Sequence, residues 1–168
     1  IWSLAESGNC FLGEELYQKH CRTSIKLNEH SFFAGRAGLL MLAIRMFDAT
    51  QNTCYYDDAR MIADSIMQEY DYMNNQHIGL MRGNAGVALS MLAAYCLFYD
   101  SKYIEYGKTL LDRDLEFSFT DEEKIGFPAK KGSNTVLPYF MEGTCGVLSV
   151  LLRYMPYFNG YSTIAVSY

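Results

Sequence analysis

Proline is scarce in this sequence. It occurs only at Pro128, Pro138 and Pro156 among 168 residues, so the first 127 residues lack the strongest helix breaker. The composition typical of intrinsic disorder is also missing, because half of the residues are hydrophobic and only a fifth are charged. These absences exclude a disordered chain and favour an all-α globular unit that is large enough to bury a core.

An excess of basic residues is missing too. The chain has 14 Lys and Arg against 19 Asp and Glu, a formal net charge of −5, and no basic stripe. Nucleic-acid binding relies on clustered Lys and Arg that release counterions, so we expect no nucleic-acid partner. Long hydrophobic runs are absent as well. The longest, residues 87–99, would rise only about 20 Å as a helix, against roughly 30 Å for a bilayer core, so we expect no membrane span.

Paired cysteines are a third absence. The chain has an odd number of cysteines, which occur singly along the sequence and form no C-x-x-C motif: Cys10, Cys21, Cys54, Cys96 and Cys145. This spacing predicts reduced, buried thiols in a cytoplasmic protein and not a disulfide framework. The chain also begins without an initiator Met and shows no signal-peptide pattern, so we interpret it as a piece of a longer protein.

What the sequence does contain is an internal repeat. The segments FFAGRAGLLMLAI, LMRGNAGVALSML and FMEGTCGVLSVLL each have G-x-x-G followed by an apolar run. The motifs begin at Gly35, Gly83 and Gly143, which are 48 and 60 residues apart. The 48-residue offset also aligns Tyr55 with Tyr103. We therefore divide the single partial domain, residues 1–168, into repeat units of about 31–78, 79–138 and 139–168.

Each unit contains two kinds of helix. The run after G-x-x-G is apolar on nearly every side, which predicts an inner helix that is covered all round. The segment that follows is amphipathic, which predicts an outer helix with one solvent-exposed face. Their alternation predicts an all-α fold, an α/α toroid or solenoid of helical hairpins. Between residues 116 and 139 turn residues separate short β-prone runs, so we expect a small β-hairpin-like insertion there.

The G-x-x-G turns do not fit a phosphate-binding loop. None is a G-x-G-x-x-G motif after a strand, and the Lys-Lys-Gly-Ser run at residues 130–133 lacks the glycine spacing of a P-loop. Glycine also permits a tight turn and a close approach of two segments. We therefore interpret each motif as a structural joint between an outer helix and the next inner helix.

The joints nevertheless define a candidate site. If all inner helices begin at one end of the fold, their N-termini direct partial positive charge into a shared cavity. Arg82 and Glu142 directly precede a first glycine and are the candidate catalytic residues, with a buried salt bridge between them as the structural alternative. The candidate substrate-binding residues flank the same turns: His30, Arg36, His77, Asn84 and Thr144.

The histidines also allow a structural interpretation. His30 and His77 precede their turns by five and six residues, where a histidine can equally cap or pack a loop. Neither an H-E-x-x-H motif nor paired C-x-x-C motifs occur, so we expect no metal site.

The repeats resemble a known family. GLMRGNAGVALSML and LPYFMEGTCGVLSVLL are similar to consecutive repeats of the lanthionine synthetase C-like family, particularly the cyclase domain of kinase-fused (class III) lanthipeptide synthetases. The resemblance covers about residues 31–154. It implies an α/α toroid, of which this chain would hold about half.

The resemblance also implies a reaction. The family adds a peptide cysteine thiol to dehydroalanine or dehydrobutyrine, which closes a thioether ring. In zinc-dependent members the metal lowers the pKa of the thiol and a histidine transfers protons. The position of that histidine corresponds here to Arg82 and that of the first zinc cysteine to Met141. The first zinc ligand is therefore missing, and the Cys-His pair that completes zinc ligation in the family belongs to later repeats, beyond Tyr168. Kinase-fused members also lack the zinc ligands, and we expect no cofactor in this segment.

Three functional hypotheses follow. The first is a fragment of a class III cyclase domain in the cytoplasm, whose partner is a ribosomally made precursor peptide; an upstream kinase-like domain in the same parent chain is left open. The second is a non-catalytic toroid that binds a peptide in an aromatic-rich groove. The third is another α/α toroid enzyme such as a glycoside hydrolase, which would need two carboxylates at the cavity mouth, where only Glu142 is well placed.

Overall fold

The chain folds into helices that pack in pairs. The computed structural model describes residues 1–168 except 23, 25–27, 122–123, 159 and 162–168. A mostly helical fold is thereby confirmed, and no helix in the described part is long and apolar enough to cross a membrane. In chain order the elements are α1 (Trp2–Glu6), α2 (Cys10–Leu16), the π-helix η1 (Tyr17–Cys21), α3 (Arg36–Thr50), α4 (Thr53–Glu69), α5 (Asn84–Phe98), α6 (Ser101–Leu115), β1 (Phe119–Asp121), β2 (Lys124–Gly126) and α7 (Thr144–Tyr154).

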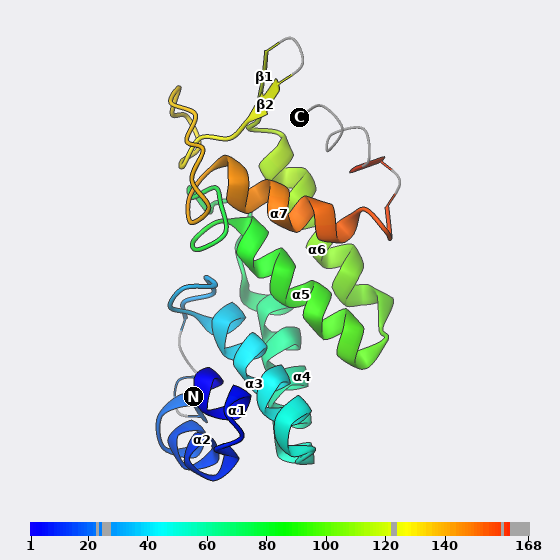
Figure 1. Cartoon of the computed structure of the whole chain (residues 1–168). Helices are drawn as coiled ribbons and strands as arrows, with labels where there is room; N and C mark the ends of the chain where they lie inside the picture. Colours follow the sequence, from blue (N-terminus) through cyan, green and yellow to red (C-terminus); the bar gives the residue numbers. More distant parts are fainter. Residues whose placement is uncertain (23, 25–27, 122–123, 159, 162–168) are drawn as a thin grey trace.

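The longer helices form two layers (Figure 1). Helix α3 packs against α4, and α5 packs against α6, so each pair is a helical hairpin. Helices α3, α5 and α7 lie side by side in one layer, with α4 and α6 behind them. The described residues therefore contain two hairpins and the inner helix of a third, in the inner and outer alternation that the sequence predicts.

The connections within the two hairpins repeat at the 48-residue offset. Helix α3 is followed by Gln51 and α5 by Tyr99, both left-handed with φ of 56° and 54°. The next residues, Asn52 and Asp100, cap the outer helices because their side chains accept a hydrogen bond from the backbone N–H two positions on. A left-handed residue that ends one helix and a cap that begins the next reverse the chain within two residues.

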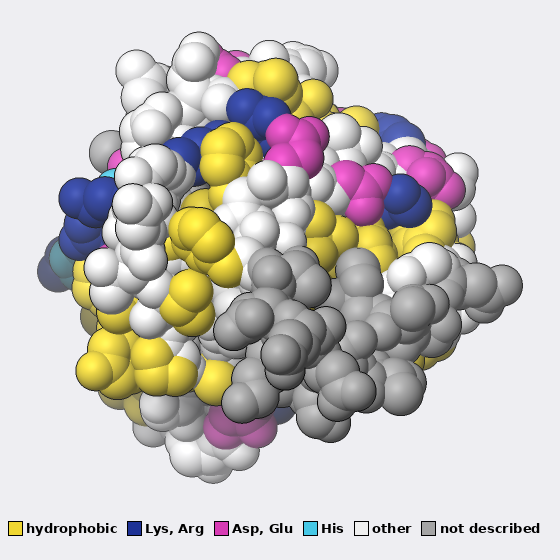
Figure 2. Space-filling view, turned by 90° about the horizontal axis from the view of Figure 1, so that it is seen from above, with side chains coloured by type: hydrophobic (Ala, Val, Ile, Leu, Met, Phe, Trp, Pro, Cys, Tyr) yellow, Lys and Arg dark blue, Asp and Glu magenta, His cyan; other side chains and the backbone are white. Residues whose placement is uncertain are grey.

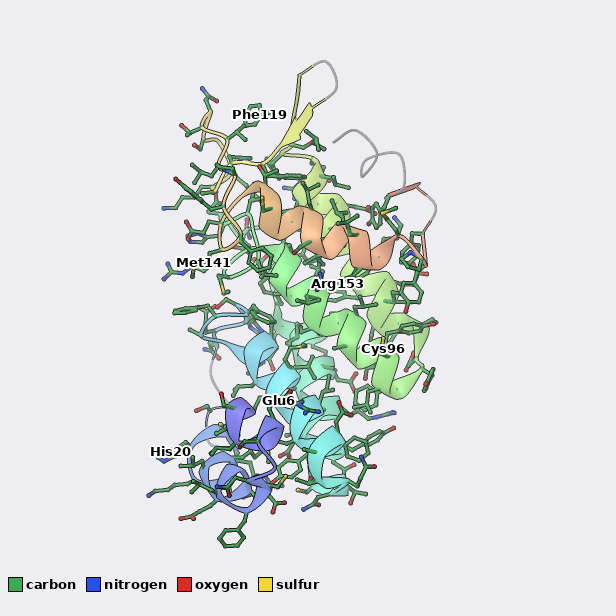
Figure 3. All side chains as sticks on the ribbon, in the orientation of Figure 1. Glu6, His20, Cys96, Phe119, Met141 and Arg153 are labelled. Atoms are coloured by element: carbon green, nitrogen blue, oxygen red, sulfur yellow. The ribbon has the colours of Figure 1, made fainter. Side chains whose placement is uncertain are left out.

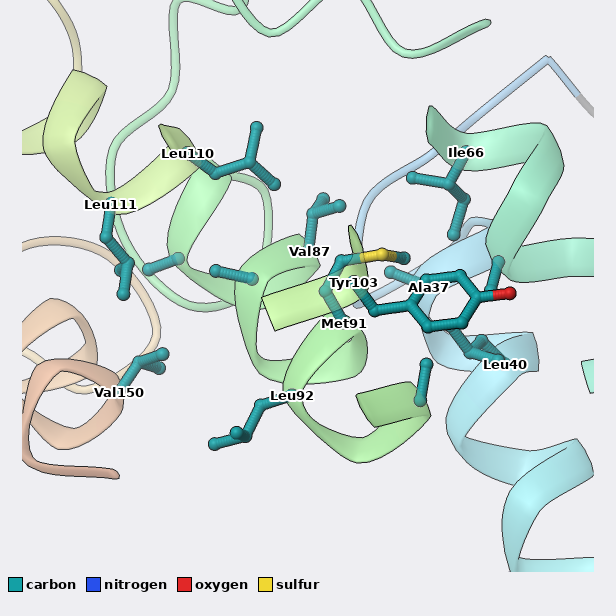
Figure 4. Close-up of a cluster of buried hydrophobic side chains, with 14 of the residues drawn as sticks. Ala37, Leu40, Ile66, Val87, Met91, Leu92, Tyr103, Leu110, Leu111 and Val150 are labelled. Carbon is teal, nitrogen blue, oxygen red and sulfur yellow. The ribbon is translucent and has the colours of Figure 1, made fainter. Parts of the chain in front are cut away.

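The core lies between the layers (Figure 4). Tyr55 on α4 and Tyr103 on α6, which the repeat aligns, are 1% and 0% exposed. Their hydroxyl groups lie close to acceptors, and that of Tyr103 donates to the Asp64 carboxylate at 2.9 Å. Other core residues come from α3 to α7: Leu40, Ile66, Val87, Met91, Leu110, Leu111 and Val150. Each such side chain contributes about 1.5–3 kcal/mol through burial, so the repeat identifies the positions that hold the layers together.

The second glycine of each G-x-x-G has the same structural role in all three repeats. A Cβ atom on Gly38, Gly86 or Gly146 would meet the carbonyl oxygen of the residue six positions earlier. At Gly38 this oxygen belongs to Phe32 and would lie only 2.5 Å away. The preceding loop can therefore cross the first turn of the inner helix only where the side chain is a hydrogen. This contact supports the interpretation of the motif as a joint.

Two expectations about burial are wrong. Cys96 and Cys145 are exposed, and the other three free thiols are only half-buried. Cys96 lies on α5, at the end far from the loop that carries Met141 (Figure 3), and Leu152 on α7 is 55% exposed. The inner helices are therefore not covered on every side in this structure. An apolar sequence predicts that a helix avoids water, but it does not show which face lacks a neighbour.

The segment between α6 and α7 contains the short strands β1 and β2. They pair antiparallel, with Phe119 opposite Gly126. Phe127, directly after β2, is 0% exposed, and its backbone N–H donates to the hydroxyl group of Thr144 at 2.9 Å. The segment is thus anchored to the first residue of α7.

Candidate functional site

The loops that precede the three inner helices meet at one end of the fold, on the left in Figure 1. The backbone N–H of Phe33 donates to the carbonyl oxygen of Met81, and the N–H of Met81 donates to that of Met141, both at 3.0 Å. Each of these residues lies two positions before a first glycine. Equivalent points of the three repeats are therefore joined by a ladder of backbone hydrogen bonds, and the N-termini of α3, α5 and α7 lie at the same end.

Two pockets adjoin at this end. The first, which we call the polar pocket, has a volume of about 400 Å³ and is lined by Glu29, Ser31, Phe33, Ala34, Tyr70, Asn75, His77 and Arg82. The second, the aromatic pocket, has a volume of about 580 Å³ and is lined by Phe33, Met81, Arg82, Tyr139, Phe140, Met141 and Glu142. Phe33 and Arg82 line both. Volumes of this order are typical of ligand sites, and all three repeats contribute to the walls.

Arg82 and Glu142 come together in the aromatic pocket. Arg82 is exposed and Glu142 is half-buried, and neither side chain forms an ion pair with a residue that the structure describes. The buried salt bridge that was the structural alternative is therefore not present here. Figure 2 shows uncovered hydrophobic side chains on this left-hand side of the molecule. Tyr139, Phe140 and Met141, which line the pocket, are all more than half exposed.

Asn75 organises the polar pocket. Its side-chain nitrogen Nδ2 donates to the Tyr70 hydroxyl at 2.7 Å and to the Arg82 carbonyl oxygen at 3.1 Å. Its oxygen Oδ1 accepts from the backbone N–H of His77 at 3.1 Å. The segments that carry Arg82 and His77 are thus fixed relative to each other. The ring nitrogen Nδ1 of His77 is buried and has no hydrogen-bond partner among the described residues.

A buried carboxyl group lies behind the polar pocket. Asn84 accepts from the Tyr70 hydroxyl at 2.7 Å and donates to the Asp114 carboxyl at 2.9 Å. Asp114 also accepts from the backbone N–H of Ala85, in the first turn of α5, at 3.2 Å. Asn84 and Asp114 are both 0% exposed, and burial raises the pKa of Asp114 to about 8, although these hydrogen bonds oppose the shift. The network therefore fixes the start of α5 to α6.

Three of the predicted substrate-binding residues occupy equivalent buried positions. Arg36, Asn84 and Thr144 are the first residues of α3, α5 and α7. A guanidinium nitrogen of Arg36 lies 2.5 Å from a carboxylate oxygen of Glu69 at the end of α4, and Thr144 bonds to the backbone of Phe127. None of the three lines either pocket. Each instead ties the start of an inner helix to the segment behind it, and contact with substrate stays a prediction.

His30 also lies outside both pockets. Its ring packs against the ring of Tyr70, with 5.4 Å between the centroids. Burial and the neighbouring Arg36 lower the pKa of His30, while Glu69 and Glu29 oppose the shift. His30 therefore packs beside Tyr70, whereas His77 lines the polar pocket, and contact of His30 with substrate stays a prediction.

Sequence reasoning missed four polar residues that line the polar pocket, namely Glu29, Ser31, Tyr70 and Asn75. The backbone N–H of Ser31 donates to a carboxylate oxygen of Glu29 at 2.9 Å, and this hydrogen bond is the main cause that lowers the pKa of Glu29. The available signal was the polar residues shortly before the first two G-x-x-G turns. That signal is weak, because polar residues are common in any exposed loop.

The donor set at these pockets does not fit a zinc ion. No group of three or more His, Cys, Asp and Glu side chains that could hold a metal occurs in the part of the chain that the structure describes. The positions that would supply a histidine and a zinc cysteine carry Arg82 and Met141, whose guanidinium and thioether are not ligands that zinc prefers.

Comparison with known proteins agrees with the repeat pattern. The model of the family described as lanthionine synthetase C-like protein matches residues 17–157. These residues include the three G-x-x-G turns and every residue that lines the two pockets. A search of curated proteins gives no significant match. Since the family model covers most of the chain, the protein belongs to the lanthionine synthetase C-like family.

Proposed function

We propose that this chain is part of the cyclase domain of a class III lanthipeptide synthetase and acts on a dehydrated precursor peptide. The observation that carries the proposal is that Arg82 and Glu142, from two repeats of a chain of this family, line one pocket. They have opposite charges, lack ion-pair partners among the described residues, and directly precede the N-caps of α5 and α7. Such an arrangement suits a reaction in which charge develops on the substrate.

The proposed step adds a cysteine thiol to the C=C bond of dehydroalanine or dehydrobutyrine. Glu142 accepts the thiol proton while the sulfur bonds to Cβ, and the π electrons move to Cα and the adjacent carbonyl. Arg82 donates hydrogen bonds to that carbonyl oxygen, which gains negative charge. Return of the proton from Glu142 to Cα completes the thioether and restores both side chains.

The proposal includes the larger architecture. The two hairpins and the third inner helix stack in one direction, and we infer that they form about half of an α/α toroid. The partner is a ribosomally made precursor peptide. Because dehydroalanine arises from an activated serine, a kinase-like domain upstream in the same parent chain would supply the substrate, and we place this reaction in the cytoplasm.

Ring formation by the intact protein that carries this chain is the test. Incubation with a dehydrated precursor peptide should remove free thiols without a change in peptide mass, as measured by thiol alkylation and mass spectrometry. Arg82→Gln and Glu142→Gln should each lower the rate about 100-fold. Lys19→Gln and Glu15→Gln remove exposed charges outside both pockets and should keep the rate within about twofold. No thiol loss, or equal rates in all four variants, would contradict the proposal.

A second candidate is a peptide-binding module without chemistry of its own. It is favoured by Arg82 and Met141 at the positions where zinc-dependent relatives carry a catalytic histidine and a zinc cysteine. In a pure binder, Arg82→Gln and Glu142→Gln should weaken peptide binding and ring formation together, whereas a catalyst should lose rate and still bind. Fluorescence anisotropy of a labelled peptide separates the two. The glycoside hydrolase hypothesis is not retained, because the family differs and the carboxylates of Glu29 and Glu142 line different pockets.

A further inference from the structure

We infer that the aromatic pocket binds an apolar side chain of an uncharged, extended peptide segment; this rests on the proposed function and names what the substrate must carry. The exposed fractions of the apolar wall residues are 61% for Phe33, 64% for Tyr139, and 54% for both Phe140 and Met141. Exposed apolar side chains are therefore concentrated in one concave site, at the end of the fold where the three loops meet. Exposed apolar surface gathered in this way marks a binding site for another molecule.

The charges in the pocket favour a peptide as its occupant. Elsewhere at this end of the fold, the guanidinium of Arg36 pairs with Glu69, and the buried carboxyl group of Asp114 accepts two hydrogen bonds. Arg82 and Glu142 have no such partner among the described residues. A peptide backbone offers a carbonyl oxygen to a guanidinium and an N–H to a carboxylate, so it satisfies both groups without bringing a charge. A charged side chain would find one attractive and one repulsive neighbour.

The walls of the pocket are held in place before any ligand binds. The backbone ladder through Phe33, Met81 and Met141 fixes the spacing of the three loops. A preformed site avoids the entropy cost of ordering loops on binding. The two methionine side chains are flexible and can adapt to apolar groups of different shape. We therefore expect the pocket to accept Phe, Leu, Ile or Met and to reject Ser and Glu, because a polar group loses its hydration there.

The experiment uses a short peptide of Gly and Ser with one central p-benzoylphenylalanine. On irradiation this apolar side chain inserts into C–H bonds that it touches, and methionine is a favoured target. After irradiation with the intact protein, the adducts are mapped by mass spectrometry. We expect adducts on Met81 or Met141 and none on Met61 or Met73, which lie outside the pocket although each is 51% exposed, close to the 54% of Met141.

Competition and variants test the chemistry of the occupant. The same peptide with central Phe or Leu should suppress the adducts, whereas peptides with central Ser or Glu should not. Phe33→Ala removes a wall and should lower the adduct yield about tenfold at limiting peptide concentration. Phe11→Ala removes an aromatic side chain that is 81% exposed on α2 and should leave the yield unchanged. Adducts spread over all four methionines, or equal competition by the Phe and Ser peptides, would overturn the inference.

The outcome can be separated from the fate of the proposed function. Selective adducts without ring formation would keep the apolar site and reject the cyclase. Ring formation with unselective adducts would keep the cyclase and reject the apolar site. The competition assay needs no variant, so it decides the question even if Phe33→Ala fails to fold.

Discussion

The hairpins α3/α4 and α5/α6 have the same shape but different chemistry at their loop ends. In the first, Arg36 at the start of α3 pairs with Glu69 at the end of α4, and the Glu69 side chain is 51% exposed. In the second, Asn84 and the backbone N–H of Ala85 at the start of α5 donate to Asp114 on α6. Asp114 is fully buried and forms no ion pair with a described residue. One hairpin is closed by an ion pair between a buried guanidinium and a half-exposed carboxylate, and the other by a desolvated hydrogen-bond network.

The difference shows which parts of the joint are fixed by geometry. Both hairpins keep the left-handed residue, the helix cap and the glycine pair in register. The closing side chains are free to differ because many donor and acceptor pairs can bridge the same two helix ends. The network of the second hairpin extends to the candidate site. It leads from Asp114 through Asn84 and Tyr70 to Asn75. Asn75 in turn donates a hydrogen bond to the Arg82 carbonyl oxygen. The position of Arg82 therefore depends on how the second hairpin is closed.

The largest expected effect comes from the glycine of the second joint. A Cβ atom on Gly86 would meet the Leu80 carbonyl oxygen and, at 2.7 Å, the Cβ atom of Phe32 from the preceding repeat. On Gly38 it would meet mainly the backbone of Phe32, in its own repeat. Gly86→Ala should therefore lower the free energy of unfolding by about 3 kcal/mol or more, and Gly38→Ala by about 1–2 kcal/mol, as measured by urea denaturation. Equal losses would show that the contact between repeats adds nothing.

Next in size is removal of the buried acceptor in the second hairpin. Asp114→Ala leaves the Asn84 amide and the Ala85 N–H buried without an acceptor. We expect a loss of about 3 kcal/mol in the free energy of unfolding, because each unsatisfied donor costs about 1–3 kcal/mol. Glu105→Ala, an exposed change on the same helix, should stay within about 0.5 kcal/mol. A loss below about 1 kcal/mol for Asp114→Ala would mean that water replaces the carboxyl group.

Much of this fold is predictable because the repeat carries it. The 48-residue offset identifies Tyr55 and Tyr103 as equivalent, and both are buried. Apolar and amphipathic periodicity separate the inner helices from the outer ones. The exposure of Cys96 is not predictable in the same way, because an all-round apolar helix gives no sign of which face lacks a neighbour. The backbone ladder between repeats is equally hidden, since it does not depend on side-chain identity.

The candidate site is predictable only in part. Proximity to the glycine turns selected Arg82, Glu142 and His77, which line the pockets, and their roles stay predictions. The same reasoning also selected the first residues of the inner helices, whose side chains bond to the segments behind them, as Asn84 does with Asp114. Spacing along the chain gives the distance from a turn but not the direction of a side chain. Asn75 was missed because its role depends on contacts with Tyr70 and Arg82 that only the folded backbone creates.

Stability measured at several pH values would separate the Arg36–Glu69 ion pair of the first hairpin from the Asp114 network of the second. Burial raises the pKa of Asp114 from 3.8 to about 8, so the folded protein holds a proton that the unfolded chain releases above pH 3.8. This group's contribution to stability is therefore fully present below about pH 4 and is lost as the pH rises towards 8. Asp114→Asn removes the titration. Between pH 5 and 8, the free energy of unfolding of the variant should rise relative to that of the unmodified protein by up to about 1.4 kcal/mol per pH unit.

Chemical denaturation of both proteins at several pH values measures this gain. A constant difference between them would mean that Asp114 keeps an ordinary pKa and that the buried network is held by a charged carboxylate. Glu69→Gln, which changes the other closure, serves as the reference for a hairpin without a buried carboxyl group.

The smallest effect is expected where the first hairpin loses its charge pair. Glu69→Gln removes the carboxylate that faces Arg36, but half of the Glu69 side chain is in contact with water. Water and salt screen such a pair, so the free energy of unfolding should fall by only about 0.5 kcal/mol, and the difference should vanish at about 1 M salt. The loss for Asp114→Ala should not change with salt, because it arises from buried donors without a partner. If both losses had the same size and the same salt dependence, the two hairpins would be closed by one kind of interaction, and the contrast between them would fail.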